Sequence, residues 1–143
     1  MDENNRMKFH YPVDGEDFSI AGEVSSTVKR TLKQLGLPPE IIRKVAISMY
    51  EGEINMVIHA HGGHIDVEIS PQEIRFVLED NGPGIENIPL AMTEGYSTAT
   101  ENIRTLGFGA GMGLPNMKKY SDEFYIESQV GKGTRVEMVV KLN

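Results

Sequence analysis

The sequence contains no cysteine and no tryptophan among its 143 residues. Without thiols, the chain cannot form disulfides, use a cysteine nucleophile or hold a metal through cysteine. Aromatic residues make up only 7% of the chain, but 39% of its residues are hydrophobic, which is ordinary for a folded protein. At this length we expect a single domain covering residues 1–143.

Two further absences limit where the protein works and what it binds. No hydrophobic run approaches the roughly 20 residues of a membrane span, and the opening Met-Asp-Glu-Asn-Asn lacks the basic and apolar parts of a signal peptide. We therefore expect a cytoplasmic protein without membrane contact. The formal net charge is −7 and no run of basic residues occurs, which disfavours a nucleic-acid partner.

The hydrophobic pattern predicts a mixed fold of strands and helices. Alternating residues predict strands at 7–13, 64–70, 73–80, 123–128 and 134–141, and helical spacing predicts helices at about 17–35, 39–60, 88–94 and 115–120. This order favours a two-layer α+β sandwich, in which a mostly antiparallel sheet carries helices on one face. We interpret the polar segment 86–107 as a mobile lid, because long loops inside small domains are usually functional.

Four glycines alternate with other residues in the stretch 107–114, Gly-Phe-Gly-Ala-Gly-Met-Gly-Leu. No side chain blocks the backbone N–H groups of these glycines, and a helix is predicted to follow, so the stretch suits a phosphate. A flexible linker is the alternative interpretation. Phe108, Met112 and Leu114 disfavour it, because a solvated linker would carry Ser, Asn or Thr.

The long predicted helix carries polar residues at intervals of three or four. Because such residues share one face of a helix, they predict a polar stripe that lines a site, formed by Ser48, Glu51, Asn55 and His59. The four histidines of the chain are scattered, so we expect no zinc site.

Four short motifs follow one another along the chain. Glu51 and Asn55 come first, then the run 80–84 (Asp-Asn-Gly-Pro-Gly), the glycine run 107–113, and the run 131–134 (Gly-Lys-Gly-Thr). In this order they resemble the nucleotide-binding boxes of the GHKL (Bergerat-fold) ATPases, which include gyrase, Hsp90, MutL and the histidine kinases. The chain is most similar to the serine kinases of bacterial partner-switching systems, the anti-sigma factor family of RsbW, SpoIIAB and RsbT.

The resemblance implies ATP and Mg²⁺ as cofactors. Asn55 would hold Mg²⁺ through its amide oxygen, as a hard cation prefers, and Glu51 would be the catalytic base. An ordinary solvent-facing glutamate is the alternative for Glu51. Asp80 would accept a hydrogen bond from the exocyclic amine of adenine, and Thr134 would support adenine through a water.

The same resemblance assigns further residues to the nucleotide. Gly82 and Gly84 would let the backbone pass close to the base, and Ile85 would pack on it. Arg104 is a candidate for the γ-phosphate, with an exposed side chain of no special role as the alternative. The phosphates would lie along the glycine run, on Gly107, Gly109, Gly111, Gly113 and Leu114.

The resemblance implies a protein serine/threonine kinase that phosphorylates a STAS-domain antagonist. The alternative is a nucleotide-gated binding module that sequesters a sigma factor or activates a phosphatase without phosphoryl transfer. A self-phosphorylating sensor kinase is disfavoured, since we expect no extra domain with a phosphoacceptor histidine. A dinucleotide-binding oxidoreductase is disfavoured because the glycine run does not follow a strand. Homodimers are common in the resembled family, but no exposed apolar stripe identifies an interface.

Overall fold

The computed structural model describes residues 6–15, 18–60, 62–85, 87–92 and 113–142. Its five strands form one sheet in the order β1-β2-β3-β5-β4, and every neighbouring pair is antiparallel. This confirms the predicted α+β class. The strands are β1 (Met7–Asp14), β2 (Gly62–Ile69), β3 (Glu73–Asp80), β4 (Glu123–Gln129) and β5 (Gly133–Lys141).

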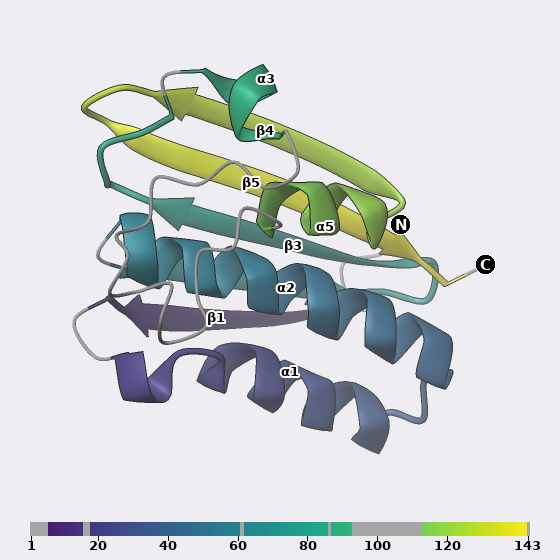
Figure 1. The fold of residues 1–143 in the computed structure, drawn as a ribbon. Coiled ribbons are helices and arrows are strands. Elements are labelled where there is room, and N and C mark those ends of the chain that lie inside the picture. Colours follow the sequence, from purple (N-terminus) through teal and green to yellow (C-terminus); the bar gives the residue numbers. More distant parts are fainter. Residues whose placement is uncertain (1–5, 16–17, 61, 86, 93–112, 143) are drawn as a thin grey trace.

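The longer helices form a second layer on one face of this sheet (Figure 1). Helix α2 lies along the sheet and contacts β1, β2, β3 and β5, while α1 and α5 pack against its two sides. Beside these helices there is a short 3-10 turn near the start and a single helical turn after β3. The bounds are η2 (Phe18–Ile20), α1 (Glu23–Gln34), α2 (Pro39–His59), α3 (Ile88–Ala91) and α5 (Gly113–Lys119).

The hydrophobic core lies between the sheet and the helices. Alternate residues of the strands point to this side, among them Ile65, Phe76 and Met138, none of which is exposed to solvent. Val45 and Met49 of α2 are equally buried and cover them. The inward-facing residues of the strands and the apolar face of α2 therefore pack against each other and form one core.

Helix α1 begins later than the sequence predicts. The described part of the expected helix before Glu23 forms the 3-10 turn η2 instead. Gly22 then adopts φ +92°, and its N–H donates to the buried Glu53 carboxylate at 3.0 Å. Because this contact fixes the chain at Gly22, the helix starts only at the next residue. The predicted end of α1 at Gly36 is confirmed. The N–H groups of Leu35, Gly36 and Leu37 donate to carbonyl oxygens of the last helical turn.

The opposite face of the sheet is charged. Basic side chains from the strands and the residue before β1 lie beside carboxylates there, as in Arg135 with Glu79 and Lys141 with Glu123. The same face holds ion pairs of Arg6 and Lys8 with Glu68, and of Arg75 with Glu73 and Glu137.

Candidate functional site

Asn55, the predicted metal ligand, and Glu51, the predicted base, lie where α2 passes the start of α5. A Cβ atom on Gly113 would stand 3.0 Å from Asn55 Nδ2 and 3.1 Å from its Oδ1. One turn earlier on α2, Glu51 Oε1 accepts a hydrogen bond from Asn116 Nδ2 at 3.4 Å. The two helices therefore run antiparallel here and bring the first predicted motif against the end of the glycine run.

Gly52 explains how α2 comes so close to its neighbours at this point. A Cβ there would lie 2.4 Å from Leu78 Cδ2 and 3.3 Å from Met117 Sδ. Glycine inside a helix lowers helix stability by about 1 kcal/mol relative to alanine. Close packing explains why glycine stands here, because a larger residue would clash with Leu78. The adjacent Glu51 side chain is thereby held at a fixed distance from α5.

Asp80 ends β3 and is held by two backbone groups. Its Oδ1 accepts hydrogen bonds from the N–H of Gly82 at 2.9 Å and of Thr134 at 3.2 Å. Its Oδ2 receives no hydrogen bond from any residue in the described part of the chain. Burial raises the pKa of this carboxyl more than the two N–H groups lower it. The arrangement leaves one partly buried acceptor oxygen for a donor from outside.

Ser128 links the segments around Asp80, although the sequence pattern did not identify it. Its Oγ accepts from the N–H of Ile85 at 2.6 Å and lies 2.8 Å from Thr134 Oγ1. It also lies 3.1 Å from the carbonyl oxygen of Gly133. The only signal for it is the register of the closing hairpin, which sets Ser128 opposite Thr134.

The glycines after Asp80 make close contacts within the protein itself. A Cβ on Gly82 would come within 2.6 Å of Ala60 Cβ at the end of α2. Gly84 has φ +82°, and a Cβ there would meet the Gln129 carbonyl oxygen at 2.4 Å. Their contact with a base stays a prediction. Ile85 is partly buried and packs against the hydrophobic core.

Several predicted residues stand elsewhere than expected or lie outside the described part of the chain. Ser48 does not line a site: it is fully buried and its hydroxyl donates to the Lys44 carbonyl at 2.7 Å, so its stripe assignment was wrong. The side chain of Leu114 is buried in the core, and its contact with a phosphate stays a prediction. The predictions outside the described residues are Arg104, Gly107, Gly109, Gly111, the His59 side chain and most of the lid.

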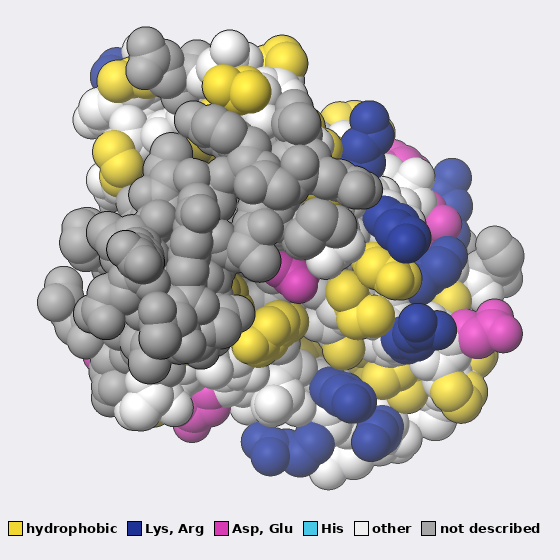
Figure 2. All heavy atoms as spheres, viewed as in Figure 1, with side chains coloured by type: hydrophobic (Ala, Val, Ile, Leu, Met, Phe, Trp, Pro, Cys, Tyr) yellow, Lys and Arg dark blue, Asp and Glu magenta, His cyan; other side chains and the backbone are white. Residues whose placement is uncertain are grey.

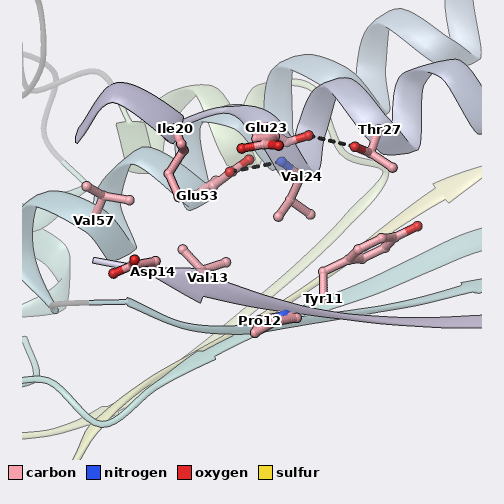
Figure 3. Close-up of a pocket in the computed structure, with 10 residues that line it drawn as sticks. All are labelled: Tyr11, Pro12, Val13, Asp14, Ile20, Glu23, Val24, Thr27, Glu53 and Val57. Atoms are coloured by element: carbon pink, nitrogen blue, oxygen red, sulfur yellow. Dashed lines mark hydrogen bonds between the residues drawn. The ribbon is translucent and has the colours of Figure 1, made fainter. Parts of the chain in front are cut away.

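Glu53 is a buried acid that the sequence analysis did not single out. It is 2% exposed, and its carboxylate accepts from the N–H groups of Gly22, Val24 and Ser25 and from the Ser25 hydroxyl, at 2.7 to 3.1 Å. Glu53 and Val57 line a hollow of about 220 Å³ between β1 and α1 (Figure 3). Because Glu53 already uses both oxygens, it anchors α1 and is not a second candidate base.

The described residues contain no group of three His, Asp or Glu side chains that could hold a metal ion. A cation beside Asn55 would therefore need further oxygen ligands, which phosphates supply. None of the described helices is both long and apolar enough to cross a membrane.

Comparisons with known proteins identify the family of the chain. Residues 49–143 match the family model of histidine kinase-, DNA gyrase B-, and HSP90-like ATPases. Over the whole chain, the anti-sigma F factor of Clostridium novyi is 31% identical, covering 96% of this chain and 95% of its own. The serine/threonine-protein kinase RsbT of Bacillus subtilis is 29% identical, with 78% and 80% covered.

Solved structures share the fold at low sequence identity. The RsbU and RsbW domains of Rv1364c from Mycobacterium tuberculosis align with a TM-score of 0.63 at 14% identity, covering 95% of this chain and 32% of that one. The SiaB-SiaC complex from Pseudomonas aeruginosa gives 0.58 at 14% identity, with 94% and 88% covered. The chain therefore belongs to the histidine kinase-, DNA gyrase B- and HSP90-like ATPase family, within the group that includes the anti-sigma F factors.

Proposed function

We propose that this chain is an ATP-dependent protein serine/threonine kinase of a bacterial partner-switching system, and that its substrate is a STAS-domain protein. The names of two relatives, anti-sigma F factor and serine/threonine-protein kinase RsbT, support this class of activity. The observation that carries the proposal is the pairing of Glu51 and Asn55 on one face of α2, both against the first turns of α5.

The residues present fit a Mg²⁺ ion beside Asn55. A Cβ on Gly113 would stand 3.0 Å from Asn55 Nδ2 and 3.1 Å from its Oδ1, so the amide lies next to the end of the glycine run. A bound Mg²⁺ would neutralise charge on the β- and γ-phosphates. Asn55 would hold the ion through Oδ1, and Asp80 would accept a hydrogen bond from the adenine amine through its second oxygen.

Glu51 would act as the base for the hydroxyl of a serine or threonine. The hydroxyl oxygen forms a bond to the γ-phosphorus while the bond to the bridging oxygen of ADP breaks, and the hydroxyl proton passes to Glu51. Asn116 donates to one carboxylate oxygen of Glu51, and the other oxygen would accept the proton of the reacting hydroxyl. Positioning of this kind supplies most of the catalysis in phosphoryl transfer.

The experiment is to incubate the purified protein with Mg·ATP and each STAS-domain protein of the same organism, and to measure the intact masses. We expect one phosphate on a STAS partner, and at least a hundredfold slower transfer with Glu51→Ala. Glu40→Ala is the matched control, because Glu40 lies exposed in the first turn of the same helix. Transfer by Glu51→Ala at the wild-type rate would refute the assignment of the base.

The same experiment tests the alternative function. A nucleotide-gated binding module would bind ATP and a partner but leave both masses unchanged. Partner affinity would then differ between the ATP and ADP states, because a gate requires differential binding to two states. Phosphate on the partner excludes a module that acts by binding alone.

A further inference from the structure

The helix layer carries a cluster of basic residues at the end distant from Asn55. Arg30 and Lys33 come from the last turns of α1, Arg43 and Lys44 from the start of α2, and Lys118 and Lys119 from the end of α5. We name these six residues the basic helix end. Figure 2 shows Lys and Arg gathered over this side of the molecule, with hydrophobic side chains between them. No run in the sequence revealed the cluster, because the fold assembles it from three helices.

The charge of the cluster contrasts with that of the whole chain. The segments 30–34, 39–49 and 113–119 contain these six cations and a single carboxylate, Glu40. The remaining residues hold eight cations against 20 carboxylates. A protein of net charge −7 therefore presents one concentrated positive surface, which attracts negative partners by a local field.

The basic helix end is also the place where cations lack counter-charges. On the outer face of the sheet, Arg6, Lys8 and Lys141 each lie within ion-pair distance of a glutamate. In the basic helix end, only Lys44 forms an ion pair with another described residue, Asp122 at 3.2 Å. Five of the six cations in the basic helix end therefore form no ion pair with another described residue, whereas Arg6, Lys8 and Lys141 of the sheet side each have one.

Aromatic and apolar groups are interspersed among these cations. Arg43 and Lys119 lie 6.0 Å and 5.4 Å from the centre of the same Tyr120 ring, so two like charges converge on one side chain. Leu35, directly after α1, is 43% exposed. Arg and Tyr are enriched at protein-binding surfaces, so the surface offers more than charge, although most of its cations are lysines.

The acidic residues in the rest of the chain favour a protein partner over nucleic acid or a membrane. Nucleic acid or an anionic membrane extends past a small patch and would meet the surrounding carboxylates, which repel it. A short protein segment can lie within the patch and avoid these carboxylates. Helices pack 8–10 Å apart, so three of them present a surface roughly 20 Å wide, which matches one helix or strand of a partner.

We infer that the basic helix end is a docking surface for an acidic protein segment that also carries apolar side chains. On α2 the surface is separate from the nucleotide site, because Arg43 and Asn55 are 12 positions apart, or about 18 Å along a helix at 1.5 Å per residue. On the shorter α5, Lys119 is six positions from Gly113, or about 9 Å along the helix. Docking there does not depend on phosphoryl transfer by Glu51.

The test uses a fluorescent 16-residue peptide of Glu and Asp with four interspersed Leu residues, titrated with the full chain at low salt. The patch variant is Lys33→Gln/Arg43→Gln/Lys119→Gln. The matched control is Arg6→Gln/Lys8→Gln/Lys141→Gln, which removes the same charges from the sheet side. ATP affinity and melting temperature of each variant verify that the fold and the nucleotide site are intact.

We expect the peptide to bind the wild type and the control equally, and the patch variant at least about tenfold more weakly, with affinity falling as salt rises. Three results would overturn the inference: no peptide binding to the wild type, equal binding to the patch variant, or tighter binding of a 20-base-pair DNA duplex or of phosphatidylserine vesicles than of the peptide. The last outcome would assign the surface to nucleic acid or to a membrane.

Discussion

Replacing Asp80 by asparagine changes one oxygen at the candidate adenine site and leaves the shape of the side chain unchanged. The amide oxygen of the variant can keep both hydrogen bonds that Asp80 Oδ1 accepts, from the N–H groups of Gly82 and Thr134. Turning the amide the other way would lose both bonds. The new NH₂ group therefore takes the place of the free oxygen, and an acceptor becomes a donor at that position.

The expected loss follows from that exchange. A hydrogen bond to a charged group contributes about 1.5–3 kcal/mol, and the variant loses one to the adenine amine. At about 2 kcal/mol the dissociation constant for ATP rises roughly 30-fold. Guanine presents a carbonyl where adenine has an amine, so the NH₂ group of Asp80→Asn suits GTP better than the carboxylate does. The ratio of ATP to GTP affinity must therefore fall.

Isothermal titration of both nucleotides measures this ratio directly. Asp66→Asn is the matched control, because it makes the same change of charge on the opposite face of the sheet, where Asp66 lies between His10 and His64. We expect wild-type nucleotide affinities for this control. If Asp80→Asn kept both the ATP affinity and the preference over GTP, the assignment of Asp80 as the adenine reader would be wrong.

The same variant gives a pH signature. Burial raises the pKa of Asp80 above its ordinary value, so its contribution to stability is greatest below the ordinary aspartate pKa and is lost as pH rises through the raised one. Asparagine does not titrate. The stability of Asp80→Asn relative to the wild type should therefore increase between acidic and neutral pH in urea melts, and a constant difference would contradict the raised pKa.

Other substitutions test the remaining contacts. Glu53→Gln places an NH₂ group against backbone donors in a buried site, so we expect a loss of about 3 kcal/mol and a melting temperature lower by about 10 °C. An unchanged melting temperature would show that Glu53 does not anchor α1. Gly113→Ala presses a Cβ on the Asn55 amide and should weaken Mg²⁺-dependent ATP binding about tenfold; equal binding would remove Asn55 from the metal site. Asn116→Asp replaces the amide donor to Glu51 by a second carboxylate, so Glu51 is no longer positioned and phosphoryl transfer should be slower. Transfer at the wild-type rate would argue against the positioning of Glu51 by Asn116.

Much of the fold could be predicted from the sequence because its strands and helices are strongly periodic. The alternation in β2 and β3 fixes which side of each strand is buried, since a slip by one residue would expose Ile65 or Phe76. The start of α1 was missed because it depends on Glu53, which lies 31 residues beyond Gly22. Local spacing contains no information about a contact of that kind.

The candidate site could be predicted only where its residues belong to sequence motifs. Asp80 and Thr134 belong to recognisable motifs, and the structure brings them into contact. Ser128 and Asn116 belong to none, because their roles arise from strand register and from the antiparallel passage of α5 along α2. For Ser48 the sequence predicted a site residue where there is none. Its hydroxyl donates to a carbonyl of its own helix, so its polarity does not indicate a ligand.

The contact between Asp80 and the Thr134 backbone joins residues 54 positions apart, and it exists only when β3 and β5 have paired. Contacts between distant segments form late, because closing a long loop costs entropy before the contact can form. A nucleotide held there would find no binding site in a half-folded chain. It would slow unfolding without accelerating folding, so the nucleotide level would govern the lifetime of each folded copy.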